Sequence, residues 1–331
     1  MGYTKSGDKK SLTLKLGQLA SAFGDFTRNY SDTSNALIDS PQPYGTYLLL
    51  RPDQLPCSNY DLQHQQGVHP NISAYHCTSL ESYNYGILPV NPYGVFGGEA
   101  NWNYGSWDAR VQITNSSPSN PKSIFSADQA LQWAAGAGYS FSNGLRMGFS
   151  SFDGPWLEGT ARREAKKHPL KQNSCACGQG VDLRYSRGRY SVSGEWMQIQ
   201  FQYPGFKTGP KVTYAYVESK VILTPRVYFA ARIGRQGHNQ VRADDYSVNR
   251  IHTVVELAND PSEGTFQPNK QSFELVLGMR PTRHTLFKIG QQWVNRSPSL
   301  GPKDHMFLMQ IVTSLPDLWL SFEKNRTRGG N

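Results

Sequence analysis

The sequence predicts an all-β chain that forms an antiparallel, up-and-down transmembrane β-barrel, and three observations support this prediction. Apolar residues alternate with small or polar ones along many segments of roughly ten residues, which is the period of a strand with two different faces. Short turns and long polar loops alternate between these segments, as they do at the two rims of a membrane barrel. No apolar run in the sequence reaches the roughly 18 residues that a membrane-spanning helix needs.

The composition of the 331 residues agrees with a barrel that has a wet interior. Hydrophobic residues make up 37% of the chain and the mean hydropathy is -0.57. A low average is expected, because each strand of a transmembrane barrel with an open channel directs half of its residues to an aqueous lumen. Aromatic residues at 12%, together with 31 Gly and 20 Pro, favour many short strands separated by turns. The same averages also fit a soluble β-sandwich, which remains an alternative.

The predicted strands come in hairpins, and the segment 130–141 shows the pattern most clearly. Large apolar residues such as Leu131 and Trp133 lie on one face, and Gln, Ala, Gly and Ser residues lie on the other. The turn at 142–144 follows, and its Asn-Gly pair is the strongest short signal for a hairpin. By the same pattern we expect strands close to residues 12–18, 95–104, 107–114, 130–141, 145–150, 181–186, 190–196, 215–223, 227–233, 273–280, 287–293 and 307–311.

Short and long connections alternate strictly between these strands. Tight turns are expected at residues 104–106, 142–144, 186–188, 224–226 and 281–283. Long polar loops are expected close to residues 115–129, 153–177, 203–210, 237–270 and 295–304. The stretch 249–257 also alternates like a strand, but a further spanning strand there would break the alternation of connections. We therefore interpret it as a strand within an outer loop.

The polar face of the predicted strands carries charges among small Gly, Ala and Ser residues, which suits a water-filled lumen. We expect nine basic and six acidic residues to line a pore: Lys15, Arg110, Arg146, Arg184, Lys220, Arg226, Arg232, Arg280 and Lys288, with Glu99, Asp108, Asp182, Glu195, Glu218 and Glu274. Aromatic residues near strand ends on the apolar face are typical of a membrane-interface girdle. They are Trp107, Tyr139, Phe141, Tyr185, Tyr190, Phe229 and Trp293.

Closure into a barrel is expected because it alone leaves no unpaired strand edge in lipid. Eleven strands are predicted from Val95 onward, and residues 12–18 add one more. The chain does not open with a secretory signal, so we expect a signal and some first strands to be missing from the N-terminus. An even total of about 14 to 18 strands would enclose an aqueous channel.

Other chemistries find little support in the residues. Cys57 and Cys77 could pair across a loop in an oxidising compartment, whereas Cys175 and Cys177 have neither zinc nor haem spacing. Despite a net charge of +9, the basic clusters at 161–168 and 323–328 lack a nucleic-acid fold or stacking motif. No nucleophile elbow or paired-acid context is recognisable. We therefore expect no cofactor, no metal, no nucleic-acid partner and no enzymatic activity.

Two runs of residues near the N-terminus resemble a known family. The run LKLGQLASAFGDF at residues 14–26, followed by NALIDSP at 35–41, is similar to a strand and its following loop in Gram-negative outer-membrane porins of the phosphate-selective type and their porin-like relatives. Residues 108–121 and 215–228 resemble strand-to-loop and hairpin passages of the same family. The resemblance covers most of the chain, but its motifs are loose.

The resemblance implies an outer-membrane barrel with a loop folded inward as a constriction, here within residues 20–44. Residues 1–94 would then hold an N-terminal strand, this loop and a further long loop, and residues 95–331 the main hairpins and a short C-terminal tail. Two features depart from the family. The chain continues past the usual terminal aromatic residue into the tail 317–331, whose role stays open, and the family's phosphate-binding arginines are not recognisable.

The leading functional expectation is passive diffusion of small hydrophilic solutes across the outer membrane, with contacts to lipid and an option of self-association. The excess of basic over acidic pore residues predicts a weak anion preference. One alternative is a barrel that acts as a sleeve and holds a partner protein across the membrane. The other alternative is a soluble β-sandwich that binds carbohydrate.

Overall fold

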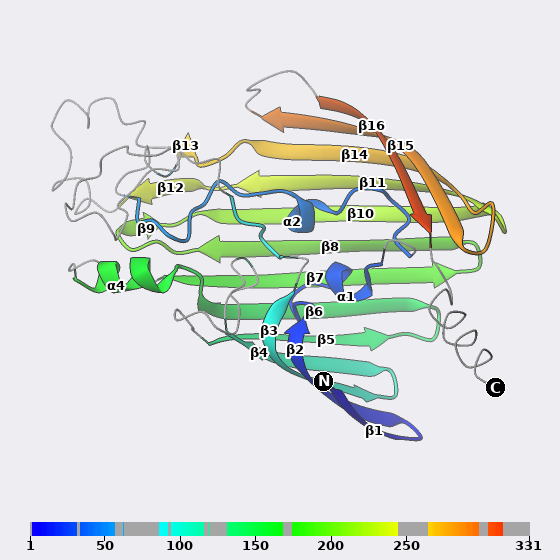
Figure 1. Ribbon diagram of the computed structural model, residues 1–331, viewed down its shortest axis with the longest axis horizontal. Coiled ribbons are helices and arrows are strands. Elements are labelled where there is room, and N and C mark those ends of the chain that lie inside the picture. The colour runs from blue at the N-terminus through cyan, green and yellow to red at the C-terminus, as the bar shows by residue number, and fades with distance from the viewer. Residues whose placement is uncertain are drawn as a thin grey trace, which may run out of the picture.

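The computed structural model describes residues 2–31, 34–56, 62, 86–91, 94–115, 119, 131–167, 174–243, 264–297 and 304–313. The fold is all-β and is dominated by one antiparallel up-and-down sheet of 13 strands (Figure 1). Its strands, in spatial order, are β1 (Gly2–Gly7), β2 (Lys10–Leu19), β3 (Val95–Tyr104), β4 (Trp107–Thr114), β5 (Gln132–Ser140), β6 (Leu145–Pro155), β7 (Cys175–Arg187), β8 (Tyr190–Phe201), β10 (Lys211–Thr224), β11 (Val227–His238), β14 (Asn269–Met279), β15 (Thr285–Ser297) and β16 (Asp304–Thr313).

The remaining elements are small. A three-stranded sheet is made by β9 (Phe206–Thr208), β12 (Gln240–Ala243) and β13 (Gly264–Thr265). The helices are α1 (Phe26–Asn29), α2 (Gln42–Gly45) and α4 (Gly159–Lys167). The basic cluster at 161–168, expected in a loop, contributes most of α4, in the connection between β6 and β7. Within the described part of the chain, no helix combines the length and the apolar character needed to cross a membrane.

All five predicted short turns lie at one rim of the sheet. The connections after β3, β5, β7, β10 and β14 are short, and backbone hydrogen bonds join each turn to its neighbour, such as Ser186 N to Gly144 O at 3.2 Å. Gly105 and Gly188 adopt positive φ angles of 57° and 59°, which allow these tight reversals. The long connections all start from the opposite rim, so the predicted alternation is confirmed.

One strand of the main sheet was missed in the sequence, as were the three short strands β9, β12 and β13, which lie in segments expected to be loops. Besides the twelve expected strands, β1 pairs with β2 over its whole length, from Gly2 opposite Lys15 to Gly7 opposite Lys10. Its sequence contains only one large apolar residue, Tyr3, so alternation cannot reveal it. Within the described residues β1 pairs only with β2 and β16 only with β15.

The two faces of the sheet have opposite environments. On one face, here called the exposed face, large apolar side chains are open, and Leu16, Ile233 and Phe307 keep 65%, 64% and 67% of their area accessible. On the other face, here called the covered face, charged and polar residues alternate with them and are largely buried. The large apolar residues of the exposed face therefore do not meet in a dry centre between two stacked sheets, as a soluble sandwich would require.

The covered face changes character along the strands. Close to the long-loop rim its residues are apolar and buried, as with Phe152, Ala176, Ile199 and Phe201. Strands β6, β7 and β8 extend beyond the predicted ends 150, 181 and 196 there, and their exposed face carries polar residues such as Asp153, Gln179 and Gln198. Near this rim the apolar residues therefore lie on the covered face and the polar ones on the exposed face, the reverse of the pattern in the rest of the strands.

Several predictions fall on residues outside the described part of the chain. These are the pair Cys57 and Cys77, the strand at 249–257, the basic stretch at 323–328 and the tail 317–331. Cys175 and Cys177 lie at the start of β7, and both thiols are free.

Candidate functional site

Residues 20–31 and 34–56, here called the covering segment, cross the covered face of the sheet. Figure 1 shows its helices α1 and α2 in front of the central strands. The loop that we expected to fold inward, residues 20–44, belongs to this segment. Its apolar residues Phe23, Leu37, Tyr44 and Leu48 are fully buried. The polar backbone of such a buried loop must find partners on the sheet, because unpaired buried amides are costly.

Glu195 of β8 is the first of two carboxylates that hold the covering segment. Its Oε1 accepts hydrogen bonds from the backbone N–H groups of Asp25 and Phe26, at 3.3 and 2.7 Å. The hydroxyl of Tyr44 donates to Oε2 at 2.7 Å, and that of Tyr216 donates to Oε1 at 2.8 Å. Burial and the neighbouring negative charge of Glu195 raise the pKa of Tyr44 well above its ordinary value, so Tyr44 remains a donor.

Glu274 of β14 is the second carboxylate and repeats this arrangement. Its Oε1 accepts from the backbone N–H groups of Ile38 and Asp39 at 2.9 and 3.2 Å. Arg232 of β11 donates to Glu274 Oε2 at 2.6 Å and to the carbonyl oxygen of Asp39 at 2.8 Å. The ammonium of Lys288, which is fully buried, donates to the carbonyl oxygen of Leu37 at 3.1 Å. Each buried charge is thereby satisfied by an opposite charge or by polar backbone.

The beginning of the covering segment is held by Arg110 of β4. Its guanidinium donates to the carbonyl oxygens of Ala22 and Gly24 at 2.7 and 2.9 Å. Residues 20–24 therefore contact β4 and β6, residues 25–26 contact β8, and residues 36–39 contact β11, β14 and β15. Charged side chains of the sheet thus fix the segment at three places.

Arg146 of β6 is the centre of an ion-pair network beneath α1. It bonds to Asp182 of β7, to Asp108 of β4 at 2.8 Å, and lies 3.8 Å from Asp25. Gly138 and Gly148 make room for this network, because a Cβ atom at either position would collide with Arg146 or Asp182. Glycine on the covered face therefore allows long charged side chains to lie flat across the neighbouring strand.

The other predicted pore residues also lie on the covered face or at its short-turn rim. Lys15 pairs with Glu99 across β2 and β3 at 3.5 Å. Arg184 lies 2.9 Å from Asp25, and Glu218 accepts from Ser193 at 2.9 Å. Lys220 lies over the ring of Tyr228, 4.6 Å from its centroid. Arg226 is exposed in the turn after β10, and Arg280 follows β14 and donates its backbone N–H to Arg226.

The covering segment is packed against an apolar cluster at the long-loop rim. Leu48 and Leu50 belong to the same buried cluster as Trp156, Tyr203 and Phe266, and the ring centroids of Trp156 and Tyr203 are 4.8 Å apart. The hydroxyl of Tyr203 donates to the carbonyl oxygen of Arg51 at 2.7 Å and accepts from its backbone N–H at 3.1 Å. The C-terminal end of the covering segment is therefore held by burial of apolar side chains, whereas residues 22–39 are held by charged side chains of the sheet.

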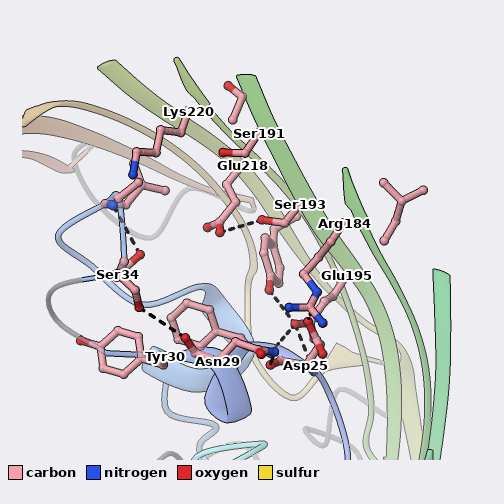
Figure 2. Close-up of a pocket in the computed structure, with 18 residues that line it drawn as sticks. Asp25, Asn29, Tyr30, Ser34, Arg184, Ser191, Ser193, Glu195, Glu218 and Lys220 are labelled. Atoms are coloured by element: carbon pink, nitrogen blue, oxygen red, sulfur yellow. Dashed lines mark hydrogen bonds and ion pairs between the residues drawn. The ribbon is translucent and has the colours of Figure 1, made fainter. Parts of the chain in front are cut away.

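A cavity of about 230 Å³ lies between the covering segment and β7, β8 and β10. Figure 2 shows Asp25, Asn29, Tyr30 and Ser34 on the side of the segment, facing Arg184, Glu195, Glu218 and Lys220 on the sheet. Its wall is a mixture of charged, hydroxyl and aromatic groups. Such a wall can contact a small polar solute, because it offers both hydrogen bonds and flat apolar surface.

Sequence reasoning missed the partners that the covering segment supplies. Asp25, Asp39 and Tyr44 contact the sheet charges, and Gln112 and Gln292 of the sheet bind the segment at Ala22 and Asp39. Gln112 and Gln292 could have been found in the sequence only because each is a polar residue at a covered-face position of a strand. For the segment itself no periodic pattern exists that could have singled these residues out.

The described residues contain no group of three or more His, Cys, Asp or Glu side chains that could hold a metal ion. The described residues form a polar sheet surface, the covering segment that is bound across it, and a cavity between the two. Compared with known proteins, the chain matches no family model, and no curated protein is similar to it in sequence.

Proposed function

We propose that the chain forms a transmembrane β-barrel in the outer membrane of a Gram-negative bacterium and acts as a porin-like channel for small hydrophilic solutes. In this proposal the covering segment is the constriction of the channel. The exposed face contacts lipid, and the covered face, where the segment leaves room, is the aqueous path. Solutes diffuse passively, and the chain performs no catalysis.

The observation that carries the proposal is the apolar character of the exposed face. On every strand from β4 to β8, for example, large apolar side chains are open on this face, including Val111, Trp133, Phe149, Val181 and Trp196. Soluble monomeric proteins rarely expose a continuous apolar surface larger than a few hundred Å². Lipid is the environment in which such a surface is stable, and strands can cross it when all their backbone groups are paired.

The aromatic residues near the short turns add support. Tyr104, Trp107, Phe141 and Tyr190 are exposed next to these turns, and Trp107 packs against Tyr139 with ring centroids 4.8 Å apart. Amphipathic rings at one level of a sheet suit the interface between hydrocarbon and headgroups.

The proposal is tested by conductance. The purified protein, refolded in detergent and added to a planar lipid bilayer, is expected to insert and give stepwise, ohmic current increases, while heat-denatured protein gives none. Folding to a water-soluble monomer without detergent, with no current under any condition, would overturn the proposal.

A second measurement tests the two faces separately. In a chain without native cysteines, spin labels at Val217→Cys on the exposed face and Ser191→Cys on the covered face are compared in vesicles. Oxygen, which concentrates in lipid, is expected to relax the label at 217 more strongly, and a water-soluble nickel complex the label at 191. Equal access of the nickel complex to both labels would contradict a lipid-facing side.

Ion selectivity tests the charge of the path. Because basic residues outnumber acidic ones among the expected pore residues, the reversal potential in a KCl gradient is expected to show a weak preference for chloride. A preference for potassium would contradict the predicted anion selectivity but not the proposed channel.

A further inference from the structure

We infer that the cavity between the covering segment and β7, β8 and β10 binds the carboxylate of a small solute with a flat apolar body, and that Lys220 is its counter-ion. This inference builds on the proposed function, since it names the solute class held within the same path. It rests on three observations: which charges of the cavity are already neutralised, how Lys220 is placed, and where the aromatic rings lie.

The acidic groups of the cavity wall already have partners. Asp25 pairs with Arg184 at 2.9 Å, and Glu195 receives four hydrogen bonds from the segment and from Tyr216. Glu218 accepts from Ser193 and lies 3.7 Å from Arg232. A cationic solute would have to compete with these contacts, so the acidic groups do not favour one.

Lys220 differs from these groups. It is half-buried on the covered face, and among the described residues no carboxylate forms an ion pair with it. Its ammonium lies over the ring of Tyr228, and that ring is fixed because its hydroxyl donates to the carbonyl oxygen of Ala36 at 3.1 Å. A partly desolvated cation without a carboxylate partner attracts an anion.

The aromatic rings favour a flat apolar body attached to that anion. Phe26 and Tyr30 lie on the segment side of the cavity with ring centroids 5.1 Å apart, and Tyr216 lines the opposite wall. Figure 2 shows Tyr30 on the segment side of the cavity and Lys220 on the sheet side, where Glu218 and Ser193 follow it towards Glu195. A ring held by these aromatic residues can direct a carboxylate to Lys220.

The single cation favours a monocarboxylate over inorganic phosphate. Phosphate sites in proteins use several cationic or backbone N–H donors around a doubly charged group. In the described cavity wall, Arg184 is engaged by Asp25, and Lys220 is the cation without a carboxylate partner. One positive charge matches one carboxylate.

Calorimetric titration of the detergent-solubilised full chain tests the inference with benzoate, with benzyl alcohol as the neutral analogue and with inorganic phosphate. Benzoate is expected to bind at least tenfold more tightly than either of the others. Lys220→Gln is expected to weaken benzoate binding by tenfold or more, and Lys220→Arg by only a few-fold, because the charge is kept. Lys211→Gln, at the other end of β10, is the matched control and should bind benzoate like the unmodified chain.

Three results would overturn the inference. They are benzoate binding that survives in Lys220→Gln, equal binding of benzyl alcohol, and tighter binding of phosphate than of benzoate. Lys220→Arg ensures that a folding defect of one variant does not decide the outcome. Because the titration needs no channel activity, a chain that binds benzoate but carries no current would contradict the proposed channel alone. Conversely, steady current without benzoate binding would contradict only the carboxylate site.

Discussion

Tyr44 of the covering segment donates a hydrogen bond of 2.7 Å to Glu195 of β8, and this contact joins residues 151 positions apart in the sequence. Glu195 also accepts from two consecutive backbone N–H groups of the same segment. The side chain of Glu195 therefore fixes both the start of α1 and the ring of Tyr44, which lies in α2. This double role makes Glu195 the position where the segment can be loosened most selectively.

Glu195→Gln is expected to increase the mobility of the covering segment without unfolding the sheet. The neutral amide accepts weaker hydrogen bonds and places an N–H beside the donors at Asp25, Phe26 and Tyr44, a loss of about 1 to 3 kcal/mol. Hydrogen exchange followed by mass spectrometry should show at least tenfold faster exchange in peptides covering residues 20–31. Glu218→Gln is the control, because Glu218 bonds to Ser193 of the sheet. Unchanged exchange in Glu195→Gln would contradict the anchoring role.

Arg232→Met is expected to destabilise the chain strongly. Arg232 and Glu274 are both buried and 2.6 Å apart, so removing the guanidinium leaves a buried carboxylate without its cation, at a cost of about 3 to 5 kcal/mol. Urea unfolding in lipid vesicles, followed by tryptophan fluorescence, measures this difference. Arg296→Met is the matched control, because its ion pair with Asp304 is exposed and is worth about 1 kcal/mol or less. Equal losses for the two variants would show that burial of the Arg232 pair is unimportant.

Ile233→Arg tests whether the exposed face meets hydrocarbon. Ile233 lies at the middle of β11, opposite Phe273, and a charge there should cost about 2 to 4 kcal/mol in a bilayer. Tyr190→Arg, at the short-turn rim, should cost about 1 kcal/mol or less. The two side chains are equally accessible, at 64% and 65%, so water would treat both substitutions alike. Folding efficiency in vesicles separates the cases, and similar efficiency of both variants would argue against a lipid-facing strand.

Alkaline pH should weaken the attachment of the covering segment to the sheet, because it ionises Tyr44, which donates a hydrogen bond to Glu195. The folded-state pKa of Tyr44 is raised, whereas in the unfolded chain it is about 10. The stabilisation that depends on this shift is therefore complete below about pH 10 and is lost as the pH rises above it. The melting temperature should fall between about pH 8 and about pH 11, and this fall should be smaller for Tyr44→Phe than for the unmodified chain. An identical fall for both proteins would exclude Tyr44 as a source of the pH dependence.

Alternation and connection length were sufficient to predict most of the sheet. The hairpin of β5 and β6 shows why: apolar residues such as Trp133 and Phe149 occur at every second position, and an Asn-Gly turn separates the strands. Both signals are local, so they can be read without knowledge of any distant residue. β1 was missed because a strand with a single large apolar residue does not show the alternation.

The ends of the strands could not be predicted in the same way. Near the long-loop rim, Phe152 and Ile199 are apolar residues on the covered face, where alternation predicts polar ones. They are explained by Trp156, Leu48 and the rest of the rim cluster, which are brought there by connections far away in the sequence. The pattern failed at the place where a second layer covers the sheet.

For the candidate site, the sequence by itself determined which side chains of the sheet share a face, because a period of two is a property of the strand alone. It could not determine that Glu195 and Glu274 each bind consecutive N–H groups of the covering segment. A carboxylate can accept several hydrogen bonds, but its sequence neighbours do not reveal which distant donors fill them. Only the tertiary structure decides this, because the path of the covering segment follows from many contacts between residues more than a hundred positions apart.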